Sequence, residues 1–91
     1  MSVPVRIPTI LRSYTGGANE VTVEGDTLVE VLDSLEQAHP GIRARVLDDE
    51  GKVRRFVNIY VANEDVRFAD GLATKTPANT QISIIPAVAG G

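Results

Sequence analysis

The feature that most constrains this chain is an amphipathic helix that follows a run of alternating apolar and polar residues. Apolar side chains recur at the i, i+3, i+4 and i+7 positions of one helical face, at Leu28, Val31, Leu32 and Leu35. Such a face must be buried against another element, and 91 residues allow only one modest core. The sequence therefore predicts a single domain in which this helix covers one face of a sheet.

Polar residues mark both ends of the helix. Thr27 followed by Glu30 has the spacing of a capping box, and Asp26 is the competing N-cap. The helix is expected to end at 39–41, His-Pro-Gly, because the residue before proline disfavours helical φ and ψ and glycine tolerates positive φ. A short helical turn is expected at 42–47.

Two strands are expected before the helix. Apolar residues alternate with other residues over 3–7, where Pro4 favours a position at an edge or at the start of the strand. The turn signal Gly16-Gly17 follows, and Val21 and Val23 resume the alternation. Together these segments predict a hairpin with a wide loop.

Three strands are expected after the helix. Residues 56–61 have apolar side chains on both faces, and Val66 and Phe68 suggest a short strand. The last strand, 82–85, is expected to stop at Pro86, which has no N–H to donate to a sheet.

The order strand, strand, helix, strand, short strand, strand limits the topology. The simplest closed arrangement puts the first and last strands side by side and parallel at the centre of a mixed sheet, which is an α+β fold of the β-grasp type. We expect this domain to occupy residues 1–86 and a flexible tail to occupy 87–91. The core is expected to contain Val5, Ile7, Val21, Val23, Leu28, Val31, Leu32, Leu35, Val57, Ile59, Val61, Ile82 and Ile84.

Composition excludes several functional classes. The chain has no cysteine, which removes disulfides, thiolate nucleophiles and cysteine-ligated metals. A net charge of −3 argues against nucleic-acid binding. The N-terminus lacks the layout of a signal peptide and no apolar run has the length of a membrane span, so we expect a cytoplasmic protein that binds no membrane.

The side chains offer no evident catalytic site. His39 is the only histidine, and beside Pro40 it is expected to be a loop or helix-end residue rather than a base. Asp48, Asp49 and Glu50 lack the alternating spacing of a calcium loop and indicate a solvated turn, so no metal site is expected. Neither a dinucleotide fingerprint nor a P-loop is present.

The C-terminal tail, 87–91, is unusual because it has no charged side chain and none larger than valine. It contains Ala87, Val88, Ala89, Gly90 and Gly91. One interpretation is a frayed terminus. The other is an extended arm that threads a narrow channel and presents the Gly91 carboxylate to another protein. A carboxylate is a poor electrophile until its oxygen becomes a good leaving group, which implies a partner that adenylates it.

A docking patch is expected at the root of this tail. Phe56 and Tyr60 share the strand face opposite the core, and Ile85 joins them if the last strand stays regular up to Pro86. The alternative is that these side chains pack under a loop. The full set of expected partner-binding residues is Phe56, Tyr60, Ile85, Pro86, Arg6 and Arg54.

Four segments together resemble the ubiquitin-like sulfur carriers of the ThiS/MoaD family, and among them the actinobacterial carriers of cysteine biosynthesis. The segments are IPTILRSYTGG at 7–17, RRFVNIYVANEDVRF at 54–68, GLAT at 71–74 and IIPAVAGG at 84–91. The likeness covers nearly the whole chain. It implies that Gly90 and Gly91 match the reactive terminus of the family, with no residue to be removed first.

The resemblance also implies a mechanism and a set of partners. An E1-like enzyme of the MoeB/ThiF type would adenylate Gly91 with ATP, and sulfide or an equivalent donor would then leave a C-terminal thiocarboxylate. The chain would thus be a protein cosubstrate and no enzyme, with no cofactor bound to itself. A pyridoxal-phosphate cysteine synthase is the expected acceptor, with a zinc peptidase acting afterwards. A thiazole-synthase-like enzyme, molybdopterin formation and sulfur-containing secondary metabolism stay open as alternatives.

Two other functions remain. The chain could be a ubiquitin-like modifier that is conjugated to lysines through Gly91, sharing the adenylation step. It could also be an interaction module with an inert tail. Sulfide-dependent thiocarboxylate formation separates the carrier from both of these.

Overall fold

The computed structural model describes residues 2–55 and 57–86. Its elements in chain order are strand β1 (Ser2–Arg6), 3₁₀ helix η1 (Thr9–Thr15), β2 (Glu20–Glu24), helix α1 (Leu28–Ala38), short helix α2 (Arg43–Val46), β3 (Val57–Val61), β4 (Glu64–Asp65), 3₁₀ helices η2 (Val66–Phe68) and η3 (Gly71–Ala73), and β5 (Ile82–Pro86).

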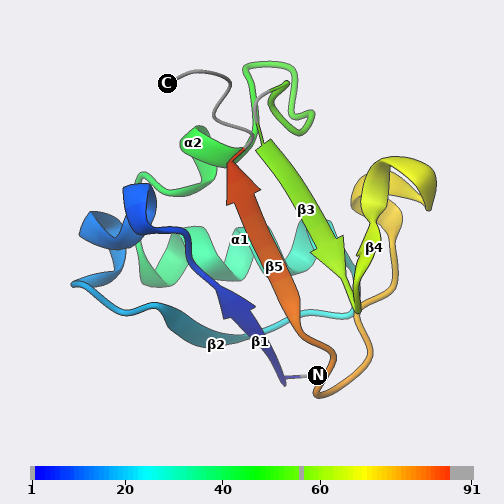
Figure 1. Cartoon of the computed structure of the whole chain (residues 1–91), viewed down its shortest axis with the longest axis horizontal. Helices are drawn as coiled ribbons and strands as arrows, with labels where there is room; N and C mark the ends of the chain where they lie inside the picture. Colours follow the sequence, from blue (N-terminus) through cyan, green and yellow to red (C-terminus); the bar gives the residue numbers. More distant parts are fainter. Residues whose placement is uncertain (1, 56, 87–91) are drawn as a thin grey trace.

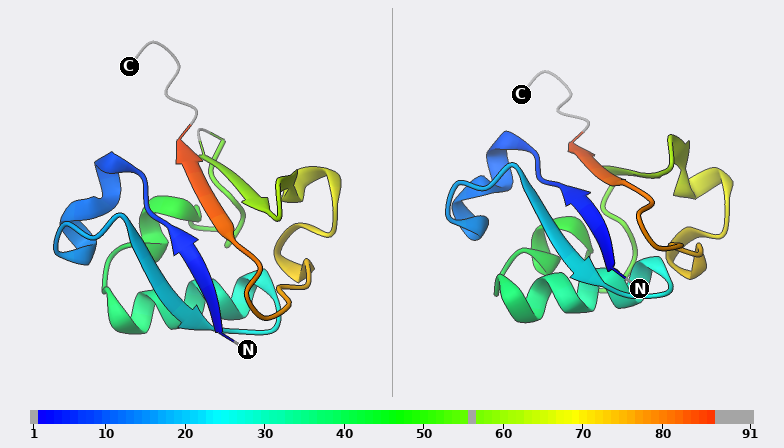
Figure 2. Two further views of the ribbon diagram at one scale, coloured as in Figure 1. Left: turned by 60° about the horizontal axis from the view of Figure 1, so that its bottom comes forward. Right: turned by 90° about the horizontal axis from the view of Figure 1, so that it is seen from below.

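The five strands form one mixed sheet in the order β2-β1-β5-β3-β4 (Figure 1). The central pair, β1 and β5, is parallel, with Val5 opposite Ile82, whereas the other neighbours are antiparallel. Helix α1 crosses one face of this sheet, as Figure 2 shows from below. The prediction of a β-grasp with the first and last strands paired at the centre is therefore confirmed.

The core lies between α1 and the inner face of the sheet. Every predicted core residue is buried except Val21, which is half-buried and packs against the core from β2. Six further residues are buried although they were not among the predicted core, and they are Val3, Leu11, Ile42, Val46, Leu47 and Val66. Four of them lie in β1, η1, α2 and η2, so the short helices contribute to the core as well as α1 and the strands.

The capping-box prediction for α1 is wrong in its details. The Thr27 side chain makes no capping hydrogen bond, and the Glu30 carboxylate accepts instead from the backbone N–H of Asp26 at 2.9 Å. The backbone N–H of Leu28 donates to the carbonyl of Thr74 at 2.9 Å. A segment far along the chain thus satisfies the first N–H of the helix, which lies before the N2 and N3 groups that a side-chain cap reaches.

Helix α1 ends at Ala38, and the N–H of the C-cap residue His39 donates to the carbonyl of Leu35 at 2.8 Å. The Glu36 carboxylate then holds the connection to α2, because it accepts from the backbone N–H groups of Gly41 and Arg43, both at 2.9 Å. These two hydrogen bonds, the one from Gly41 first, hold the pKa of Glu36 below its ordinary value. The predicted helical turn at 42–47 is confirmed as α2.

The predicted strand at Val66–Phe68 is wrong, since these residues form 3₁₀ helix η2 and the short strand is β4 just before them. The Asp65 carboxylate accepts from the backbone N–H of Arg67 at 2.8 Å, which turns the chain before a strand can continue. The predicted wide loop after β1 likewise contains a 3₁₀ helix, η1.

The acidic segment at 48–50 is a turn held by one of its own side chains. The Asp48 carboxylate accepts from the backbone N–H groups of Glu50 and Lys52 at 2.9 and 3.0 Å. These hydrogen bonds lower the pKa of Asp48, and the bond from Lys52 has the larger effect. Among residues 2–55 and 57–86, no cluster of three or more potential metal ligands is found. In the same part of the chain, no helix combines the length and the apolar character needed to cross a membrane.

Candidate functional site

The root of the C-terminal tail lies at the carboxyl ends of the two central strands, because β1 and β5 are parallel. The carboxyl ends of parallel neighbours lie on the same side of the sheet. β5 therefore ends at Pro86 near the point where the chain leaves β1 and enters η1. Residues 7 and 8 connect β1 to η1, and the 3₁₀ helix stands alongside the end of β5 (Figures 1 and 2). An open groove separates the two.

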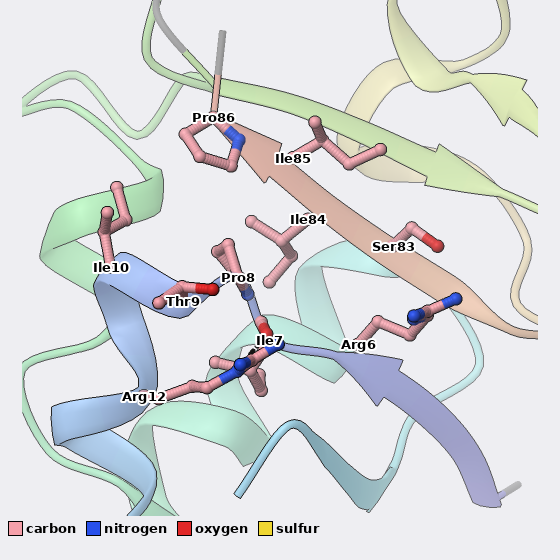
Figure 3. Close-up of a pocket in the computed structure, with 10 residues that line it drawn as sticks. All are labelled: Arg6, Ile7, Pro8, Thr9, Ile10, Arg12, Ser83, Ile84, Ile85 and Pro86. Atoms are coloured by element: carbon pink, nitrogen blue, oxygen red, sulfur yellow. Dashed lines mark hydrogen bonds between the residues drawn. The ribbon is translucent and has the colours of Figure 1, made fainter. Parts of the chain in front are cut away.

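The groove has a volume of about 490 Å³ and two apolar sides. Ile10 on η1 is 62% exposed, and Ile85 on β5 is 48% exposed. Figure 3 shows Ile10 on η1 and Pro86 at the end of β5, and Ile84 and Pro8 also line the groove. Exposed isoleucines at the root of a chain terminus are typical of a surface that another protein covers.

Two arginines border the groove and make it basic on a chain that is acidic overall. Arg6, the last residue of β1, and Arg12 on η1 both line it (Figure 3). The Arg12 Nε donates to the carbonyl of Ile7 at 3.2 Å, which holds η1 against the end of β1. The groove therefore combines apolar contact area with cationic groups that would attract an acidic partner.

The outer face of the sheet continues from the groove. Arg6 is opposite Ser83 on β5, and Ser83 is opposite Tyr60 on β3, so these three residues form one row across the face that α1 does not cover. Asn58 and Ile85 form the next row. Ile85 is exposed whereas its neighbour Ile84 is buried, so β5 stays regular to its end. Tyr60 and Ile85 thus share the outer face; their role in binding stays a prediction.

The structure does not bring Arg54 to this face. Its Nε donates to the carbonyl of Ala44 in α2 at 2.9 Å, and its side chain lines a second hollow of about 520 Å³ together with Glu36 and Asp48. Of the two expected rim arginines, only Arg6 borders the groove. Phe56, Ala87, Val88, Ala89, Gly90 and Gly91 lie outside the described residues.

Sequence reasoning missed η1 as one side of the groove, with its residues Ile10 and Arg12. The segment was interpreted as a loop because Gly16-Gly17 follows it. A local signal was nevertheless present, since Ile10 and Leu11 are adjacent apolar residues that cannot point the same way in a helical turn. Leu11 is buried, which leaves Ile10 exposed.

A mixed sheet that is covered on one face by a helix and has its first and last strands parallel at the centre defines a ubiquitin-like β-grasp protein. The ThiS family model matches residues 5–91. The chain belongs to the ThiS family.

Similar proteins span the full length of the chain. It is 53% identical to "Sulfur carrier protein CysO" of Mycobacterium tuberculosis, over all of both chains. A chain in the crystal structure of the Amycolatopsis orientalis BexX/CysO complex matches with a TM-score of 0.92 and 48% identity, covering 98% of this chain and 99% of that one. Small archaeal modifier protein 1 of Haloferax volcanii matches with a TM-score of 0.80 and 26% identity, covering 96% and 98% of the two chains.

Proposed function

We propose that this protein is a sulfur carrier whose C-terminal Gly91 is converted to a thiocarboxylate. The observation that carries the proposal is the 53% identity to a sulfur carrier over the whole of both chains. The match to the ThiS family supports it independently and extends through Gly91. The chain would act as a protein cosubstrate rather than as an enzyme.

The chemistry needs two steps on the terminal carboxylate. An E1-like enzyme of the MoeB/ThiF type would let a Gly91 carboxylate oxygen attack the α-phosphorus of ATP, forming the acyl adenylate and releasing pyrophosphate. Hydrosulfide would then attack the carbonyl carbon, the C–O bond to AMP would break, and a proton would be lost to leave the thiocarboxylate. The partner enzyme thus uses ATP and sulfide, and this chain provides the Gly91 carbonyl carbon to which the sulfur becomes bonded.

The arrangement of the fold supports this division of labour. β5 is central in the sheet, where it pairs with β1 and β3, so its end at Pro86 has a defined place on the body. The groove with Ile10, Ile85 and Arg6 lies beside that end. A partner that covers the groove would bind the tail at a defined position relative to its active site. Such positioning of reacting groups is what gives intramolecular reactions their large effective concentrations.

The sulfur acceptor is a separate question, which the enzyme that docks would decide. We propose cysteine formation on a pyridoxal-phosphate synthase as the first candidate, followed by a zinc peptidase that releases the product. The relative in the BexX/CysO complex supports the view that carriers of this shape bind other proteins. Thiazole, molybdopterin or secondary-metabolite synthases are the other candidates.

The test is the intact mass of the chain after incubation with ATP, sulfide and an E1-like enzyme. We expect a mass gain equal to the exchange of one oxygen for one sulfur, and its loss when the chain is then incubated with the accepting synthase and its substrate. Omitting ATP is the control. An unchanged mass with every E1-like enzyme from the same cell would refute the proposal.

A second candidate is a protein modifier that is joined to lysines. It is favoured by the identity of 35% over 72 residues to small archaeal modifier protein 1 of Haloferax volcanii. The same adenylation would precede it, but the product would be an isopeptide adduct. A ladder of lysine adducts formed from this chain without sulfide would favour the modifier over the carrier.

A further inference from the structure

Arg67 in η2 is an exposed arginine whose guanidinium nevertheless has three hydrogen-bond acceptors on another segment. Its Nη2 donates to the carbonyl of Val57 at 2.6 Å and to the carbonyl of Arg54 at 2.8 Å, and its Nη1 donates to the Oδ1 of Asn58. A surface arginine is ordinarily mobile, and fixing it costs side-chain entropy. Three charge-assisted hydrogen bonds to neighbouring groups offset that cost.

These acceptors lie at the start of β3, which faces the root of the tail. Val57 is opposite Pro86 in the β3–β5 pair, and Asn58 is opposite Ile85. Arg54 and Val57 also close a turn, in which the N–H of Val57 donates to the carbonyl of Arg54 at 3.0 Å. One guanidinium therefore ties together the turn that leads into β3 and the strand residues beside the end of β5.

The base of the Arg67 side chain is itself fixed to the body. Its backbone N–H donates to the Asp65 carboxylate at 2.8 Å, and the preceding residue, Val66, is buried in the core. Asp65 belongs to β4, which pairs with β3 at Tyr60. The guanidinium is thus held from the far edge of the sheet and does not move with the turn that it holds.

We propose that Arg67 is the positioning residue for the root of the C-terminal tail. By holding the carbonyls of Arg54 and Val57, it keeps the start of β3 in place against Pro86, so that the outer face and the end of β5 are already arranged when a partner binds. Its importance for sulfur loading rests on the proposed function; its effect on the order of β3 does not.

Arginine suits this role because its planar guanidinium carries five N–H donors in a fixed arrangement. Lysine keeps the charge but places three donors on one atom, and glutamine keeps polarity without the charge or the reach. Arg67→Gln should therefore loosen the turn, and Arg67→Lys should have an intermediate effect. Lys52→Gln is the matched control, since it removes one charge from a side chain that is 77% exposed and whose ion pair with Glu50 spans 4.0 Å.

Amide hydrogen exchange of the free protein tests directly whether Arg67 holds the start of β3. In Arg67→Gln we expect the Val57 amide to exchange about tenfold faster or more, because its turn opens locally. The Ala62 amide, which donates to Gln81 at the other end of the β3–β5 pair at 3.0 Å, should keep its rate. Arg67→Lys gives the same readout if the glutamine variant fails to fold. Unchanged Val57 exchange, or an equal rise at Ala62, would overturn the proposal.

Steady-state loading by an E1-like enzyme that accepts the wild-type chain tests the consequence. We expect Arg67→Gln to raise the KM for the carrier about three- to tenfold and to leave kcat within about twofold, because docking restores the arrangement that the free variant has lost. Lys52→Gln should match wild type. Faster Val57 exchange with an unchanged KM would overturn the positioning role. Failure of the wild-type chain to be loaded would instead refute the proposed function, while hydrogen exchange would still decide whether Arg67 holds the start of β3.

Discussion

Replacing Ile10 by serine tests whether the groove beside Pro86 is the surface that an activating enzyme covers. Ile10 is 62% exposed on η1, and Leu11 beside it carries the core contact. The substitution should therefore leave folding almost unchanged. Unlike Ile85, Ile10 is not in a strand, so no loss of β-propensity complicates the result.

The expected magnitude follows from the exposed fraction. Burying a whole isoleucine side chain is worth about 1.5–3 kcal/mol, so covering the exposed 62% would contribute about 0.9–1.9 kcal/mol to docking. Since 1.4 kcal/mol corresponds to a factor of ten, the affinity of the carrier for the enzyme should fall about 4- to 23-fold.

The assay is calorimetric titration of the E1-like enzyme with wild-type and variant carriers, with the thermal midpoint of each carrier measured in parallel. Phe68→Ser is the matched control, because Phe68 is 87% exposed on η2 and does not line the groove. If general surface hydrophobicity governed binding, this control would lose more affinity than Ile10→Ser. Equal affinities of wild type and Ile10→Ser, at unchanged stability, would refute the assignment of the groove.

Three further predictions concern the core, the helix connection and the tail. Leu32→Ala removes a fully buried side chain and should cost about 2–5 kcal/mol of stability, which lowers the thermal midpoint by about 10 °C or more. Gln37→Ala, at an exposed position on the same helix, should leave the midpoint unchanged. An unchanged midpoint of Leu32→Ala would mean that α1 does not bury this face. Because two backbone N–H groups depress the pKa of Glu36 in the folded state, its contribution to stability is complete above its ordinary value of 4.5 and is lost as the pH falls through the depressed value. Glu36→Gln should therefore flatten the acid side of the curve of stability against pH, and an identical curve would contradict this. Deleting Gly91, or replacing Gly90 by valine, should abolish thiocarboxylate formation at an unchanged thermal midpoint, and normal sulfur loading of the Gly91 deletion would contradict the carrier function.

The order and pairing of the strands could be predicted from the sequence because each signal was local and strong. The apolar spacing of Leu28 to Leu35 could only be a helix, and the alternation around Val5, Val23 and Ile59 could only be strands with one buried face. With one helix to cover one sheet, few arrangements bury all of these residues. The central pairing of β1 with β5 is the simplest of these arrangements, although the pattern alone does not demand it.

The candidate site was predicted only in part. Ile85 and Arg6 are at the groove and on the outer face, because a regular strand fixes which side each residue takes, and Pro86 lines the groove as the last residue of β5. Arg54 is not, since its side chain is held by a carbonyl in α2 that no local pattern identifies. The expected role of Phe56 lies outside the described residues.

The sequence by itself determined helix α1, the four longer strands with their inner and outer faces, and the Gly90-Gly91 terminus, since these depend on periodicity and on chemistry within a few residues. Only the tertiary structure decided that η1 forms one side of the groove, that the carbonyl of Thr74 accepts from the first N–H of α1, and that Arg67 holds the start of β3. Each of these depends on contacts between residues far apart in the chain, and such contacts leave no periodic signal in the segments that make them.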